Sequence, residues 1–350
     1  MKGYKRKKVL LVIDNAYGFA GTENVCNFMS ECLVESNSVT IYSLKGSGET
    51  FYPFNGVAGV ISFGEEERPL KALINQINNS DFDTIFIISM GRLSVLFAIH
   101  SLCKSFLKRT KIYACEHVAL SSFSIPIKIL KFLFLRVYNS VIVLTEKDAS
   151  LLKSWKIRTT VIANPVKHQG LEKEKRSRVA IAVGRLTAQK GMDLLLNNWA
   201  EFIVVNPEWR LEIAGEGELD NELKEKTKIL GLNDSIHFLG KVHDMESLYK
   251  KADLLLMTSR YEGLPLVLLE AKAWGIPVIA YDCPTGPREI IEHGKDGFLI
   301  ERDDHCDYIG KMNELAKNDA LYFSFSRNTK LTSRKFDANI LRKKWVSLAK

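Results

Sequence analysis

Short apolar runs alternate with longer helical patterns along almost the whole chain. Apolar runs of this length, bounded by turn residues, are typical of strands buried on both faces of a parallel sheet. Helix-sized stretches such as 23–34 and 70–78 separate the runs, which predicts repeated βαβ units. The expected strands are 9–13, 38–43, 84–89, 111–114 and 140–144, then 179–183, 210–214, 236–239, 254–257 and 278–281.

A polar, charged stretch at 167–178 interrupts this alternation and is expected to be a linker. A chain of 350 residues is too long for one ordinary core. We therefore expect an α/β protein with two doubly wound, Rossmann-like domains, at 1–166 and 179–320. A helical segment at 321–350 would follow, and it could pack back on the first domain. Ligands bind open α/β sheets at their carboxyl edges, so two such domains predict a cleft with one substrate held by each.

Composition excludes several classes of protein. Six scattered cysteines without a C-x-x-C pair indicate reduced thiols in the cytoplasm, not a disulfide framework or zinc site. The net charge of +8 suits anionic partners, and without a helix-turn-helix or RNA-binding signature we expect no nucleic acid. No apolar run approaches the roughly 18 residues of a membrane span, and the run at 9–13 is too short for a signal peptide. We expect a cytoplasmic protein, soluble or peripheral on the inner face of the membrane.

The strongest motif, R-Y-E-G-L-P-L-V-L-L-E-A at 260–271, follows an expected strand and opens a helix. Pro265 suits a first helical turn, whose free N–H groups favour phosphate, and Gly263 permits a close backbone approach. Glu262 and Glu270 would repel phosphate, so they are better suited to accept hydrogen bonds from hydroxyl groups. A helix cap with a surface glutamate is the alternative.

Two further motifs follow strands of the second domain. G-R-L-T-A-Q-K-G at 184–191 sets Arg185 and Lys190 on one turn, where they can neutralise a diphosphate. A basic loop without a ligand is the alternative. A-G-E-G-E-L at 214–219 is weak evidence alone, because a tight turn has the same pattern. Its value lies in its order relative to the other two motifs.

These motifs continue with F-L-G-K-V at 238–242 and G-I-P-V-I-A at 275–280. The ordered set resembles the family 4 retaining glycosyltransferases of the GT-B fold, over residues 179–300. The resemblance implies that Arg185 and Lys190 hold the diphosphate of a nucleotide sugar. It further implies donor-binding roles for Gly184, Val242, Glu262, Gly263, Leu264, Pro265, Leu266 and Glu270.

Within that set, the resemblance implies a distinct contact for each group. Glu262 lies at the hydroxyl groups of the transferred sugar, and Glu270 binds the ribose. The backbone of 263–266 lines the sugar and the distal phosphate, whereas Val242 lies beside the nucleobase. The implied catalytic residues are Glu262, His117, Arg185 and Lys190.

The first domain is similar to the family more loosely. Gly21, Thr22 and Glu23 resemble part of its G-G-x-E loop, which approaches the donor phosphate and the acceptor, with Ala20 in place of the first glycine. His117 follows an expected strand, at the position of a family histidine that contacts the sugar ring. Taken alone, such a histidine is more often a satisfied core residue.

The resemblance implies a retaining glycosyltransferase that moves a hexose or N-acetylhexosamine from a nucleotide-diphosphate sugar, with UDP the expected nucleotide. The stretch C-P-T-G-P-R-E-I-I at 283–291 is similar to bacterial members that build surface polysaccharides, so a lipid-linked glycan acceptor is expected. No cofactor or metal is expected, because two cations and a helix dipole supply positive charge. The acidic runs 81–83 and 303–305 only imitate metal motifs. A non-catalytic nucleotide-sugar-binding protein, an epimerase and a phosphorylase of similar fold remain alternatives.

The segment 124–139 is apolar, with Lys128, Lys131 and Arg136 interspersed. A basic amphipathic helix on an anionic membrane would have this pattern, with the three cations toward the lipid. A core helix with one exposed edge would have it too. The sequence leaves both interpretations open.

Overall fold

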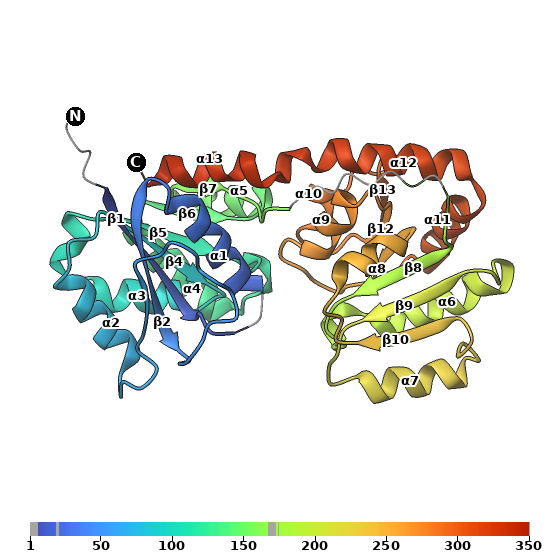
Figure 1. The fold of residues 1–350 in the computed structure, drawn as a ribbon, viewed down its shortest axis with the longest axis horizontal. Coiled ribbons are helices and arrows are strands. Elements are labelled where there is room, and N and C mark those ends of the chain that lie inside the picture. The colour runs from blue at the N-terminus through green and yellow to red at the C-terminus, as the bar shows by residue number, and fades with distance from the viewer. Residues whose placement is uncertain (1–5, 19–20, 167–172, 174, 350) are drawn as a thin grey trace. The chain divides into compact units, whose positions relative to one another are not determined.

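The computed structural model describes residues 6–18, 21–166, 173 and 175–349. It divides into two compact units, one of Met1–Pro165 with Ala338–Lys350 and the other of Val166–Asp337 (Figure 1). Most of the expected linker lies outside the described residues. The expected helical segment 321–350 is shared between the units, since its last helix belongs to the first unit and the rest to the second.

The first unit contains a parallel sheet of seven strands in the order β3-β2-β1-β4-β5-β6-β7. All five strands expected in this half are present, but two short edge strands were not predicted. The edge strands are only partly buried and lack an apolar run, so nothing in the sequence pattern marks them. The strands are β1 (Lys7–Asn15), β2 (Asn37–Lys45), β3 (Gly59–Ser62), β4 (Thr84–Ser89), β5 (Lys111–Glu116), β6 (Ser140–Val143) and β7 (Thr159–Val161).

Helices cover both faces of this sheet. Alternate residues of β1 point to opposite faces, so Leu11 packs in a cluster with α1 and α13, and Val12 in a cluster with α2, α3 and α5. Trp345 of α13 meets Phe86 of β4 edge-on, with ring centroids 5.8 Å apart. The helices are α1 (Gly21–Leu33), α2 (Pro69–Asn78), α3 (Leu93–Ser101), α4 (Ile125–Phe134), α5 (Glu146–Ser154) and α13 (Ala338–Leu348).

The second unit contains a parallel sheet of six strands in the order β10-β9-β8-β11-β12-β13. Four of its strands have the expected bounds, β10 is one residue longer, and β13 was not predicted. The strands are β8 (Val179–Val183), β9 (Arg210–Ala214), β10 (Ile236–Gly240), β11 (Leu254–Met257), β12 (Val278–Tyr281) and β13 (Gly297–Ile300).

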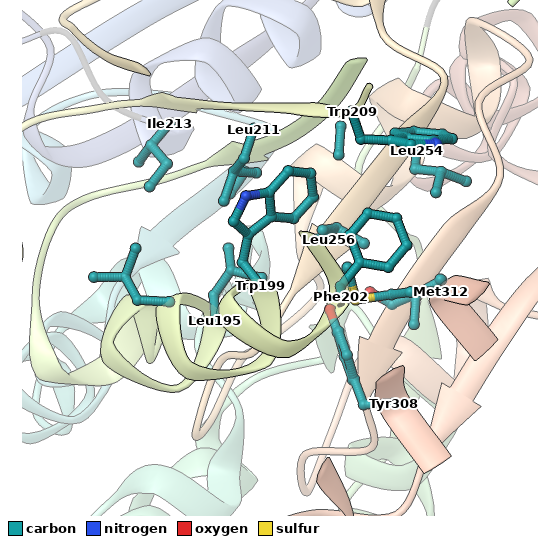
Figure 2. Packing of buried hydrophobic residues seen from close by; sticks show 14 of the residues in the cluster. Leu195, Trp199, Phe202, Trp209, Leu211, Ile213, Leu254, Leu256, Tyr308 and Met312 are labelled. Carbon is teal, nitrogen blue, oxygen red and sulfur yellow. Dashed lines mark hydrogen bonds between the residues drawn. The ribbon is translucent and has the colours of Figure 1, made fainter. Parts of the chain in front are cut away.

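Large aromatic side chains fill the core on one face of this sheet (Figure 2). Trp199 and Phe202 of α6 pack with Trp209 and with Met312 of α11. The helices of the unit are α6 (Met192–Val205), α7 (Asp220–Ile229), α8 (Met245–Lys251), α9 (Leu266–Ala273), α10 (Pro287–Ile290), α11 (His305–Lys317) and α12 (Asp319–Thr332). Buried packing of this kind fixes the strand ends from which the motif loops project.

The two acidic runs that imitate metal motifs have structural roles. Asp83 accepts a hydrogen bond from the backbone N–H of Lys8 at 2.8 Å, and Asp81 pairs with the Lys8 ammonium at 2.7 Å. Asp304 caps α11 by accepting from the N–H of Asp307 at 2.9 Å. Within the described ranges, no three His, Cys, Asp or Glu side chains gather in a group that could hold a metal ion.

Candidate functional site

Strand order brings the sequence motifs of the second unit together. The loops at 184–191, 214–219 and 258–265 follow β8, β9 and β11, and β8 lies between β9 and β11 in the sheet. Since all strands are parallel, the three loops meet at one carboxyl edge. From β8 the chain runs to β9 and β10 on one side, and it then crosses to β11 on the other side of β8. Open α/β sheets bind ligands where the strand order reverses in this way.

The G-x-G loop after β9 supports the loop after β8. A Cβ added to Gly215 would lie 1.9 Å from the carbonyl oxygen of Gly184, and one on Gly217 would lie 2.3 Å from that of Leu186. The backbone N–H of Leu186 donates to the carbonyl of Glu216 at 2.9 Å. These glycines are therefore required by the contact between two loops, which explains this motif without a ligand.

An ion pair joins the first turn of α6, which follows the loop after β8, to the loop after β11. The Arg260 guanidinium donates to both carboxylate oxygens of Asp193, at 2.9 and 2.8 Å, and holds the pKa of that carboxyl below its usual value. It also donates to the carbonyl of Ala188 at 2.7 Å. Gly191 approaches so closely that a Cβ there would lie 2.2 Å from the carbonyl oxygen of Thr258. The two loops form one rigid edge.

Lys190 and Glu262, predicted from different motifs, are in contact. The Lys190 ammonium lies 2.7 Å from Oε1 of Glu262, and the two side chains are 16% and 8% exposed. Arg185 is exposed and forms no ion pair with any residue that the structure describes. The edge thus presents a largely buried cation, Lys190, beside the acceptor Glu262, and an exposed cation, Arg185.

The start of α9 faces this same edge. The helix begins at Leu266 with Pro265 as its N-cap, one residue later than the sequence indicated, and Gly275 follows its end with a positive φ of 78°. The first N–H groups of a helix have no partner within it and carry partial positive charge. They add to the field of Arg185 and Lys190.

A second loop, after β12, supports Glu262 and Gly263. The Thr285 hydroxyl donates to the carbonyl of Glu262. Gly286 has a φ of 94°, and a Cβ there would lie 2.3 Å from the carbonyl oxygen of Gly263. The stretch 283–291 therefore positions the Glu262 loop, a role that the sequence did not predict for it.

Glu270 lies within α9 and is held by a tyrosine of α8. The Tyr249 hydroxyl donates to Oε2 of Glu270 at 2.6 Å, and the Tyr249 ring stacks on Trp274 with centroids 6.4 Å apart. Burial raises the pKa of Glu270, and the hydrogen bond from Tyr249 opposes that shift. A carboxylate can accept several hydrogen bonds, so Glu270 keeps capacity for a ligand. Val242 lies between β10 and α8, partly buried.

Sequence reasoning missed four residues that position this edge: Asp193, Tyr249, Thr285 and Gly286. Thr285 and Gly286 belong to the stretch 283–291, which was singled out only for its similarity to bacterial family members, so its glycine was a usable signal. Asp193 follows the motif glycine Gly191 by two residues, so its place near the motif could also have been predicted from the sequence. Tyr249 has no signal, because it meets Glu270 only through the packing of α8 on α9.

In the first unit, His117 follows β5 at the carboxyl edge, as predicted. Both of its ring nitrogens are buried, and neither makes a hydrogen bond of normal geometry with the described residues. Burial lowers the pKa of His117 to about 4, with the amide of Asn164 opposing the shift. The imidazole is therefore neutral at physiological pH.

Gly21, Thr22 and Glu23 form the first turn of α1, where the sequence suggested a loop. Phe19 and Ala20, the latter in place of the family's first glycine, lie outside the described residues. Glu23 is buried, and its Oε2 has no hydrogen-bond partner among described side chains and backbone. An unpaired buried carboxylate oxygen costs stability, which suits an atom reserved for a ligand.

The expected membrane contact of Lys131 is wrong. Its side chain is fully buried, with the ammonium 2.8 Å from Oε2 of Glu116 and 3.3 Å from the Ser94 hydroxyl. Lys131 lies on the inner face of α4, so burial of a charge is compensated by this ion pair. Lys128 and Arg136 do reach the surface. Among the helices described, none is long and apolar enough to span a bilayer.

Known proteins similar to this chain include glycosyltransferases. The family "Glycosyl transferases group 1" matches residues 164–332. The amylovoran biosynthesis glycosyltransferase AmsD of Erwinia amylovora is 33% identical, over 97% of this chain and 98% of its own. The GalNAc-alpha-(1->4)-GalNAc-alpha-(1->3)-diNAcBac-PP-undecaprenol alpha-1,4-N-acetyl-D-galactosaminyltransferase of Campylobacter jejuni is 25% identical, over 94% of each chain. The solved structure of Anabaena Alr3699/HepE in complex with UDP superposes with a TM-score of 0.80 at 20% identity, covering 97% of this chain and 98% of that one.

The buried imidazole predicts a specific dependence of stability on pH. The pKa of His117 is about 4 when folded against 6.5 in its ordinary state, so the unfolded chain binds the proton first as pH falls. The free energy of unfolding should therefore fall between pH 6.5 and 4, by about 3 kcal/mol more in the native chain than in His117→Gln. Urea denaturation at several pH values measures this. His305→Gln, at an exposed histidine, is the control, and its free energy of unfolding should depend on pH as in the native chain. The same pH dependence in all three proteins would contradict the assignment.

Proposed function

The chain belongs to the group 1 glycosyl transferases and has the GT-B fold, and on this premise we propose that it transfers a hexose or N-acetylhexosamine from UDP to a glycan. The observation that carries the proposal is the contact of Lys190 with Glu262 beside the exposed Arg185. This arrangement sets cations for a diphosphate next to an acceptor for sugar hydroxyl groups. The start of α9 adds further N–H donors.

Arg185 and Lys190 grip the diphosphate of the donor. The guanidinium of Arg185 is free to form a bidentate contact, whereas Lys190 supplies a point charge. An ammonium has three N–H donors, so Lys190 can keep Glu262 and still bind a phosphate oxygen. The Gly184 backbone and the 263–266 backbone line the diphosphate and the sugar.

The two glutamates read hydroxyl groups on either side of the diphosphate. Glu262 receives the hydroxyls of the transferred sugar, since its carboxylate lies beside Lys190 at the loop. Glu270 receives the ribose hydroxyls, with Tyr249 fixing its second oxygen. Val242 lies in the loop after β10, where its main chain contacts the nucleobase.

The relatives support UDP and a surface glycan. The Anabaena structure holds UDP on the same fold, and the Erwinia relative, matched along nearly its full length, takes part in amylovoran biosynthesis. The Campylobacter relative is named for an oligosaccharide on PP-undecaprenol. We therefore propose a lipid-linked glycan acceptor in the synthesis of a bacterial surface polysaccharide.

The proposed transfer retains the configuration of the anomeric carbon. The bond from that carbon to the phosphate oxygen breaks, and the acceptor oxygen bonds to the same face of the sugar. The proton of the acceptor hydroxyl passes to the departing phosphate oxygen, and UDP leaves. Protein groups act by position and charge: Arg185 and Lys190 stabilise the leaving diphosphate, and neutral His117 contacts the sugar ring. Gly21, Thr22 and Glu23 approach the acceptor.

We further propose that the reaction needs no metal ion and takes place in the cytoplasm. Two cations and a helix start supply the charge that a divalent ion brings to other diphosphate sites. The six cysteines are free thiols, four of them buried, which suits a reducing compartment.

Incubation with a panel of UDP- and GDP-sugars in the presence of EDTA tests the proposal. We expect slow hydrolysis of one UDP-sugar, with the released or transferred sugar first appearing in its original anomeric form by NMR. Activity that appears only after a divalent metal is added would contradict the metal-independent mechanism. Epimerisation of the donor, or binding without turnover in the presence of glycan acceptors, would contradict the transfer itself.

Removal of either diphosphate cation should slow turnover strongly. Arg185→Ala and Lys190→Ala should each lower kcat by roughly 10²–10³-fold, because each contributes charge stabilisation to the leaving group. Arg210→Ala, at an exposed arginine at the far end of β9, is the matched control and should retain the native rate. Native rates in both loop variants would refute the assignment.

Loss of the Tyr249 hydroxyl should make donor binding depend on pH. The pKa of Glu270 is already raised by burial, and removing the opposing hydrogen bond raises it further. A larger fraction of Glu270 is then protonated at pH 6 than at pH 8, so Tyr249→Phe should weaken UDP binding more at pH 6. Calorimetric titration with UDP at pH 6 and at pH 8 measures the ratio of the two dissociation constants in each protein. Tyr261→Phe, at an exposed tyrosine beside Glu262, should show no such difference; an equal loss at both pH values in Tyr249→Phe would argue against the link.

A further inference from the structure

We propose that the outer face of α4, together with basic side chains beside it, binds the surface of an anionic lipid bilayer. This inference goes beyond the proposed function. It concerns side chains of the first unit alone, and it can be tested without any sugar donor.

The outer face of α4 is apolar and uncovered. Ile125, Ile129 and Leu133 recur at every fourth position and therefore share one side of the helix. They are 73%, 54% and 53% exposed, and the flanking Leu130 and Phe132 are 39% and 38% exposed. Isolated exposed side chains of this size are ordinary, but five of them within one ten-residue helix mark an interaction surface.

Lys131 shows that only the outer face of α4 is exposed, because its own side chain lies on the opposite, buried face. Its fully buried ammonium, paired with Glu116, anchors the opposite side of the helix to the sheet. α4 therefore cannot turn its apolar side chains inward without breaking a buried ion pair, which is strongly destabilising. The outer face is held outward by the fold.

Basic side chains border the apolar face. The Arg136 guanidinium lies 4.2 Å from the Phe132 ring centroid and donates to the Trp155 carbonyl at 2.9 Å. Trp155 itself contacts the Phe132 ring, with centroids 5.7 Å apart. Its neighbours along the chain include three exposed cations, Lys153, Lys156 and Arg158.

The basic excess of the chain lies in the part of the sequence that contains α4 and α5. Residues 90–158 contain 12 basic and three acidic side chains, whereas the remaining residues contain 37 and 38. Two of the three acids, Glu116 and Asp148, are buried. An anionic bilayer accepts both features at once, since apolar side chains enter the boundary of the acyl chains while cations stay at the headgroups. Charge complementarity therefore favours lipid over a second copy of this basic face.

Sedimentation with vesicles tests the proposal on the full chain. We expect binding to phosphatidylcholine vesicles that contain about 30 mol% phosphatidylglycerol, and little binding to phosphatidylcholine alone. Raising the NaCl concentration from about 0.1 to 0.5 M should release much of the protein, because salt screens the headgroup charge.

Matched variants separate the two contributions. Ile125→Ser/Ile129→Ser/Leu133→Ser should weaken vesicle binding by at least about tenfold, and each of Arg136→Gln, Lys153→Gln and Lys156→Gln by about fivefold. The control Val204→Ser/Ile229→Ser alters two side chains of the second unit that are each 77% exposed, and should bind like the native chain. Near-ultraviolet circular dichroism confirms that every variant is folded.

Three results would overturn the proposal. These are equal binding to neutral and anionic vesicles, no binding to either, and equal losses in the α4 variants and the control. A dimer in solution that the triple serine variant dissociates, without vesicle binding by the native chain, would assign the same face to a second copy.

Discussion

The close approach of four backbone loops, those after β8, β9, β11 and β12, at the carboxyl edge of the second sheet is the constraint on which the candidate site depends. Gly191, Gly215 and Gly286 each lie where a Cβ would meet a carbonyl oxygen of a neighbouring loop at 2.3 Å or less. These contacts leave little freedom for the segments that carry Arg185, Lys190 and Glu262. Preorganised charge of this kind costs no reorganisation when a reaction begins, which is why it stabilises transition states better than water does.

Two ion pairs complete this rigidity and also determine the chemistry of the edge. The pair of Arg260 and Asp193 is structural, since two hydrogen bonds join the guanidinium to both carboxylate oxygens. Lys190 and Glu262 are joined by a single hydrogen bond, which leaves two N–H donors of the ammonium for a ligand. One pair therefore holds the loops, and the other can share its charges with a ligand.

Local pattern predicted most of this structure, and the failures have physical causes. Buried strands such as β4 and β11 were predicted with their observed bounds, because burial on both faces demands a continuous apolar run. The edge strands β3 and β7 are half solvated, so their sequences need no such run. The motif loops were predicted because their residues are adjacent in the chain. Tyr249 was missed because its partner comes from another helix, and Lys131 was misplaced because charge normally indicates exposure.

The last helix of the chain has a consequence for the order in which the molecule acquires structure. The first unit needs Trp345 of α13 to cover Phe86, so its core stays incomplete until α13 has left the ribosome. The second unit is continuous from Val166 to Asp337, and its two ends pair as a β-bridge. Domains usually fold from the N-terminus onward during synthesis. Here the second unit, whose sequence lies between the two segments of the first unit, can complete its fold before the first unit does.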